Sequence, residues 1–124
     1  MIEQEARLPD FIIGGAPKCG TTSLHFILAQ NPSVGIPDNE IHYFDADDPV
    51  AHPDFLFVEK DRLDWFDARA GNADNLAWYA SRFAPFQDAS AIGEDSTTYL
   101  LSESAPPRIK ALLPEVKLIF LLRD

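Results

Sequence analysis

The sequence has little of what stabilises secreted or membrane proteins. Only one of its 124 residues, Cys19, is a cysteine, so no disulfide can form within the chain and a reducing compartment is expected. No apolar run approaches the roughly 18–20 residues that cross a bilayer. The acidic first ten residues, MIEQEARLPD, also lack the apolar core of a signal peptide. These absences predict a soluble, cytoplasmic protein.

Positive charge is also scarce. The chain has 10 Lys and Arg against 20 Asp and Glu, a net charge of −10. Nucleic acids and anionic membranes bind basic surfaces, so neither is expected as a partner. An anionic ligand must therefore be held by a local group of donors that acts against the overall field. The hydrophobic fraction of 46% is typical of a globular chain with one modest core.

The chain begins its ordered pattern with a strand, a glycine turn and a helix. The apolar residues 11–13 predict a buried strand that ends at Gly14 and Gly15, and residues 21–30 predict a helix that ends at Asn31-Pro32. A short strand at 34–36 would complete a βαβ unit with a right-handed crossover.

The rest of the chain continues this alternation. It predicts a helix over 75–83 capped by Asp74 or Asn75, a strand near 91–93, a helix that starts at Pro106-Pro107, and a central parallel strand over 116–122. Residues 45–69 carry eight acidic and three basic side chains, which predicts a solvated excursion with a short helix around 62–68. The expected fold is a three-layer α/β/α domain with a central parallel sheet.

The turn between the first strand and helix has the chemistry of an anion site. Gly15 and Gly20 have the G-x-x-x-x-G spacing of a phosphate loop, and the helix start supplies N–H donors. A nucleotide-triphosphate loop continues with lysine, but here Thr21 follows Gly20. Lys18 lies inside the loop instead. The spacing thus predicts a P-loop-like turn that is built for a different anion.

At this point the sequence resembles a family. PKCGTTSL (17–24) resembles the 5′-phosphosulfate loop of sulfotransferases that use 3′-phosphoadenosine 5′-phosphosulfate (PAPS). EIHYF (40–44) and GEDSTTY (93–99) resemble the K-E-x-H-[FY]-F and G-E-K-[ST]-P-x-Y segments of heparan-sulfate and carbohydrate sulfotransferases. KLIFLLRD (117–124) resembles the strand that opens their 3′-phosphate motif. Asn39 and Asp95 stand where that family often has lysine.

The resemblance implies sulfuryl transfer from PAPS to a hydroxyl or amine acceptor, without a metal. Lys18 would contact the bridging or leaving oxygen, and Glu40 would be the general base, with His42 assisting at the acceptor. Arg123 would bind the 3′-phosphate. The 5′-phosphate would be held by the loop and helix start: Cys19, Gly20, Thr21, Thr22 and Ser23.

Alternatives remain open from the sequence. Glu40 is also compatible with a solvated loop carboxylate, His42 with a hydrogen-bonded core histidine, and Arg123 with a surface arginine. The whole chain is compatible with a Mg²⁺-dependent P-loop kinase or with a non-catalytic truncated product.

The end of the chain and the acceptor give two further expectations. The sequence stops at Arg123-Asp124, where a ligand loop would emerge, so we expect residues 1–124 to be the N-terminal part of a single sulfotransferase-like domain, inactive or nearly so alone. The charge of −5 over 45–69, three basic minus eight acidic side chains, favours a neutral sugar, lipid or small metabolite as acceptor.

Overall fold

The structure, a computed structural model, describes residues 6–53, 56–59, 62–65 and 72–123. Its centre is a four-stranded sheet in the order β2-β5-β1-β6, in which every neighbouring pair is parallel. This confirms the predicted α/β fold around a central parallel sheet. The strands are β1 (Phe11–Gly15), β2 (Val34–Gly35), β5 (Ala91–Asp95) and β6 (Lys117–Phe120).

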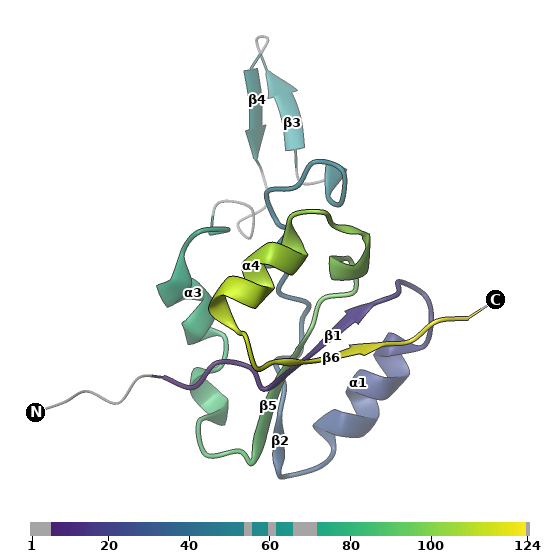
Figure 1. The fold of residues 1–124 in the computed structure, drawn as a ribbon, viewed down its shortest axis with the longest axis vertical. Helices are drawn as coiled ribbons and strands as arrows, with labels where there is room; N and C mark the ends of the chain where they lie inside the picture. Colours follow the sequence, from purple (N-terminus) through teal and green to yellow (C-terminus); the bar gives the residue numbers. More distant parts are fainter. Residues whose placement is uncertain (1–5, 54–55, 60–61, 66–71, 124) are drawn as a thin grey trace, which may run out of the picture.

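Helices cover both faces of this sheet. Figure 1 shows α1 on one side and α3 and α4 on the other, which is the three-layer arrangement that the sequence predicts. The cap of α3 is also as predicted, because the Asn75 side chain accepts a hydrogen bond from Trp78 N at 3.0 Å. The helices are α1 (Thr21–Ala29), α3 (Leu76–Ser81) and α4 (Ala105–Leu112), with 3₁₀ turns at Ala84–Phe86 and Tyr99–Leu101.

The core lies between the sheet and the α3–α4 layer. Ile12 of β1 and Ile92 of β5 are fully buried there. Aromatic rings fill the space beside them, with Tyr43 stacked on Tyr79 at 4.3 Å between ring centroids and Phe83 edge-on to Tyr79 at 5.1 Å. Such contacts bury a large apolar area. The hydrophobic effect of this burial is the main contribution that holds the loop 41–46 against α3.

The structure corrects the prediction for residues 45–69. Residues 62–65 form a strand, β4 (Arg62–Trp65), antiparallel to β3 (Leu56–Glu59), where a helix around 62–68 was expected. The R-L-D-W alternation of β4 has period two, which suits a strand. Residues 66–68 of the expected helix lie outside the described residues. In Figure 1 the hairpin projects away from the sheet.

Two further predictions about exposure are wrong. Asp45, expected in the solvated excursion, is 0% exposed, because its carboxylate is hydrogen-bonded inside the fold. β6, expected at the centre of the sheet, lies at its edge among the described strands, since it pairs with β1 alone. Its apolar run faces α4 on one side and is partly exposed, with Leu118 at 49%. Within the described ranges, no helix has the length and apolarity to cross a membrane.

Candidate functional site

The predicted loop joins β1 to α1 and leaves the helix start open. Gly20 is the N-cap in a left-handed conformation (φ 91°), which glycine adopts at little cost. No side chain caps this helix end, and the first backbone hydrogen bond of the helix is donated by Leu24 N to Gly20 O. The preceding N–H groups are those that a helix cannot satisfy internally, so they suit an anion.

Two predicted site residues have left-handed backbones. Among the described residues, Lys18 (φ 61°) and His42 (φ 56°) are the non-glycine residues with positive φ. This conformation costs energy for side chains other than glycine, and it persists where surrounding contacts impose it. Lys18 is exposed on the loop between β1 and α1 and lines a cavity there.

The end of β6 lies against the same loop. Ala16 N donates to Leu121 O at 2.9 Å, and Leu121 N donates to Gly15 O at 2.8 Å. Arg123 follows two residues later and is exposed. The structure therefore brings Arg123 to the sheet edge where the loop emerges, although it records no contact between the Arg123 side chain and the loop.

A cavity of about 640 Å³ opens beside the loop and brings two predicted catalytic residues together. Lys18, Thr21 and Thr22 line it from the loop and α1, and Glu40 lines it from the opposite segment. His25 of α1 and Asp95 of β5 also line it, although the sequence analysis gave neither a role. The remaining predicted residues, Cys19, Gly20, Ser23, His42 and Arg123, are not among its lining residues.

The carboxylate of Glu40 is fixed by Thr97. Glu40 Oε1 accepts hydrogen bonds from Thr97 N at 2.7 Å and Thr97 Oγ1 at 2.6 Å, and Glu40 Oε2 lies 3.6 Å from His42 Nε2. Partial burial raises the pKa of Glu40, but the hydrogen bonds from His42 and Thr97 outweigh this and lower the pKa to about 2. Glu40 is therefore an ionised, oriented carboxylate.

His42 belongs to a buried network behind Glu40. Thr98 Oγ1 lies 3.0 Å from His42 Nδ1, 2.7 Å from Asp45 Oδ2 and 3.1 Å from His52 Nε2. His52 Nε2 is also 2.8 Å from Asp45 Oδ1. In the part of the chain that the structure describes, His42, Asp45 and His52 are close enough together to suit a metal ion. The Thr98 hydroxyl lies between them at hydrogen-bond distances, so hydrogen bonding accounts for their arrangement.

Ser96 holds the segment that carries Glu40 and His42. Its hydroxyl accepts hydrogen bonds from Ile41 N at 3.2 Å and His42 N at 2.9 Å, and it donates to Glu94 Oε1 at 2.7 Å. Glu94 is fully buried, which raises its pKa, and it also accepts from the Tyr79 hydroxyl. The sequence alone assigns Ser96 no firm role. The available signal was its position directly after a strand at the ligand edge of the sheet.

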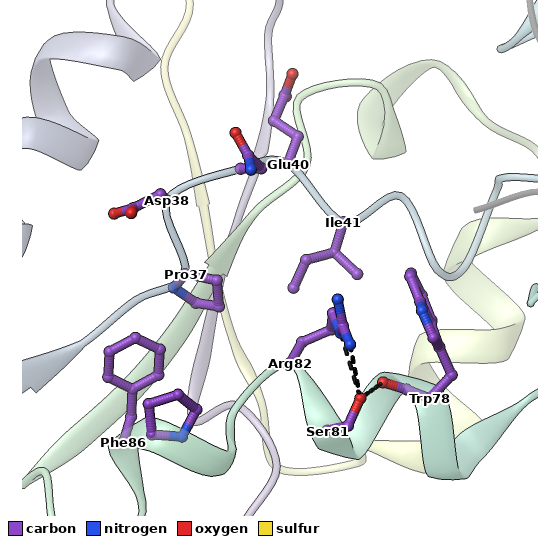
Figure 2. A pocket seen from close by; sticks show the side chains of 10 residues that line it. Pro37, Asp38, Glu40, Ile41, Trp78, Ser81, Arg82 and Phe86 are labelled. Atoms are coloured by element: carbon purple, nitrogen blue, oxygen red, sulfur yellow. Dashed lines mark hydrogen bonds between the residues drawn. The ribbon is translucent and has the colours of Figure 1, made fainter. Parts of the chain in front are cut away.

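A second cavity of about 860 Å³ lies on the other side of the 38–40 segment. Figure 2 shows Pro37 and Ile41 on one side of it and Trp78 and Arg82 of the α3 region on the other. The Arg82 guanidinium lies 5.0 Å from the centre of the Trp78 ring. Because residues 38–40 line both cavities, Glu40 lies where the two adjoin.

A parallel sheet whose first strand–helix turn presents a lysine and an open helix start to a cavity defines an α/β protein of P-loop-like fold. The chain belongs to the sulfotransferase family, whose sequence profile matches residues 9–124. This membership favours sulfuryl transfer over the kinase alternative.

Known proteins agree with this assignment. The chain is 33% identical to human bifunctional heparan sulfate N-deacetylase/N-sulfotransferase 2 over 95% of its length, which is 12% of that protein. It is 29% identical to the membrane-associated sulfotransferase kil1 of Dictyostelium discoideum over 94% of its length (21% of that protein), and 29% identical to human heparan sulfate glucosamine 3-O-sulfotransferase 6 over 95% (28% of that protein).

A solved structure shows the same fold. The sulfotransferase from Alicyclobacillus acidocaldarius superposes with a TM-score of 0.66 at 26% identity. The match covers 92% of this chain and 44% of that one. The chain thus spans less than half of the length of each of these relatives.

Proposed function

We propose that this chain carries the donor loop and proton acceptor of a PAPS-dependent sulfotransferase. The observation that carries the proposal is that Lys18 and the open start of α1 line the same cavity as Glu40. A sulfuryl donor and an acceptor nucleophile must meet between such groups, because transfer needs both in one place.

The donor side fits a phosphosulfate. The N–H groups and hydroxyls of Thr21, Thr22 and Ser23 would hold the 5′-phosphate at the start of α1, with Cys19 and Gly20 shaping the loop around it. Lys18 would contact the bridging oxygen. Arg123, at the same sheet edge, would hold the 3′-phosphate. These donors supply positive potential without a metal ion.

The chemistry requires charge stabilisation and removal of one proton. The acceptor oxygen or nitrogen forms a bond to sulfur, and the bond from sulfur to the bridging oxygen breaks with its electron pair left on the phosphate. Lys18 would stabilise that developing charge. Glu40 would orient the acceptor and take its proton, with His42 behind it in the buried network.

The second cavity suits the acceptor. Trp78, with Arg82 over its ring, offers an aromatic surface, and Asp38 and Asn39 add polar groups at the wall nearest Glu40. Aromatic faces with flanking polar groups bind sugar-like or other partly apolar hydroxyl compounds. Two of the relatives carry heparan sulfate in their names. We propose a sugar, lipid or small-molecule hydroxyl or amine as the acceptor class here.

Binding of 3′-phosphoadenosine 5′-phosphate (PAP), measured by calorimetry, tests the donor site. Lys18→Ala should weaken binding about 10- to 100-fold, because a hydrogen bond to a charged group contributes roughly 1.5–3 kcal/mol. Lys110→Ala, which removes an exposed lysine of α4 in the opposite layer, is the matched control and should bind like the wild type. Wild-type protein that fails to bind PAP would refute the proposed function.

A further inference from the structure

His25 lies on α1, one helical turn after Thr21, the first residue of the helix. Its side chain is 14% exposed and lines the same cavity as Lys18 and Glu40. Helix geometry explains this placement, because residues i and i+4 share a face and His25 therefore follows Thr21 on the cavity side.

Asp95 of β5 orients the His25 ring. Asp95 Oδ2 is 3.0 Å from His25 Nδ1, and the Asp95 side chain is only 6% exposed. Its Oδ1 is buried and has no hydrogen-bond partner among the described residues, so the imidazole is the donor on which this carboxylate depends. Because an ionised carboxylate only accepts hydrogen bonds, we assign the ring proton to Nδ1. The neutral ring then keeps its lone pair on Nε2.

The charges around the pair agree with this arrangement. Burial raises the pKa of Asp95, and the hydrogen bond from His25 acts in the opposite direction. The other charged groups that line the cavity are Lys18 from the loop and Asp38 and Glu40 from the facing segment. Two of these three are acidic, so a positive charge that forms on His25 is compensated within the cavity.

Glu40 alone is a weak proton acceptor in this geometry. Both Thr97 donors bind its Oε1, and these bonds would have to weaken when the carboxylate gains a proton. General bases work best when their affinity for a proton matches the working pH, and imidazole meets that condition near neutrality. The cavity thus holds a further candidate proton acceptor, His25, on its α1 wall.

We propose that His25 is a second proton acceptor at the sulfuryl-transfer site and that Asp95 is the residue that positions it. The inference rests on the proposed function. On this second route, as the acceptor forms its bond to sulfur and the phosphate leaves with the bridging electron pair, the acceptor proton moves to His25 Nε2 in place of Glu40. Asp95 then lies against the imidazolium and balances its charge, while Glu40 orients the acceptor.

The position of the His25 ring proton, and the contact of His25 with PAP, are measured by ¹⁵N–¹H NMR of the three histidine rings of the 124-residue chain. His25→Gln assigns the signals. We expect the neutral His25 ring to carry its proton on Nδ1, Asp95→Leu to remove that preference, and added PAP to shift the His25 signals. A neutral ring with its proton on Nε2, or PAP that shifts the loop signals but not those of His25, would overturn the inference. PAP that shifts no loop signal would overturn the proposed function instead.

Proton transfer is tested by sulfate release from PAPS with water as the acceptor, in a longer protein that contains residues 1–124, because these residues alone are expected to be nearly inactive. His25→Gln should lower kcat about 100-fold, the lower range for loss of a general base, and should leave KM for PAPS within about twofold. Asp95→Leu should lower kcat in the same direction. Gln30→Ala, at the exposed end of α1, is the control. A His25→Gln profile that superimposes on the wild type would refute the proton-acceptor role.

Discussion

At the scale of single residues, the ionisation of Glu40 depends on two neighbours, His42 and Thr97. Thr97 donates two hydrogen bonds to Glu40 Oε1, one from the backbone and one from the hydroxyl. Such bonds stabilise the charged form of a carboxyl group, so the side chain at 97 contributes, with His42, to the low pKa of Glu40.

Thr97→Val tests this dependence. It should raise the pKa of Glu40 from about 2 toward the ordinary 4.5, because the hydroxyl donor is lost while the backbone N–H and His42 remain. Because the folded-state pKa of Glu40 lies below its ordinary value, the ionised carboxylate adds to the free energy of unfolding above about pH 4.5. This contribution is lost as the pH falls through about 2. The wild type should therefore be more stable than the variant above about pH 4.5, and this difference in unfolding free energy should shrink as the pH falls toward about 2.

The measurement is a ¹³C titration of the Glu40 carboxyl group together with urea unfolding at several pH values. Thr22→Val, which removes an exposed hydroxyl at the start of α1, serves as the control. An unchanged Glu40 titration in Thr97→Val would show that the hydroxyl does not set this pKa.

At the scale of elements, the turn after β5 connects three parts of the site. Ser96 links the backbone of Ile41 and His42 to the buried Glu94 of β5, and Glu94 in turn accepts from Tyr79 of α3. The position of the 40–42 segment therefore depends on one hydroxyl that is 0% exposed.

Ser96→Ala should destabilise the fold by about 1–3 kcal/mol, because it leaves two buried N–H groups and one carboxylate oxygen without their partner. Urea unfolding measures this. Ser33→Ala, at an exposed position before β2, should stay within about 0.5 kcal/mol of the wild type. A Ser96→Ala protein as stable as the wild type would mean that other donors replace the hydroxyl.

The elements also show where prediction from sequence works. Strand β1, the helix α1 and the Asn75 cap follow from local signals, namely apolar runs, glycines and capping residues. β4 was mistaken for a helix because a four-residue strand gives a weak periodic signal. The edge position of β6 was missed because its apolar run resembles that of a strand buried on both faces.

At the scale of the whole molecule, the net charge of −10 opposes an anionic donor. Long-range repulsion weakens as salt shortens the Debye length from about 30 Å at 0.01 M to about 10 Å at 0.1 M. Short contacts inside the cavity are screened less. The rate of PAP association should therefore rise over this salt range, the opposite of what a basic nucleic-acid-binding protein shows.

Stopped-flow association kinetics check this expectation. Glu115→Lys changes the net charge from −10 to −8 at an exposed turn before β6, and its association rate should depend less steeply on salt. A wild-type rate that falls as salt rises would show that a local positive field, not the net charge, governs the encounter.

The sequence by itself predicted the alternation of strands and helices around the parallel sheet and the glycine loop that contains Lys18, because these depend on local patterns. Glu40 was a candidate site residue through the family resemblance. Only the tertiary structure decided which groups meet. Glu40 bonds Thr97 across 57 positions and His25 bonds Asp95 across 70, and such contacts depend on strand register and core packing. Strand register and core packing depend on the whole chain and not on any short segment. The buried hydrogen-bond networks behind the cavity are therefore visible only in the tertiary structure.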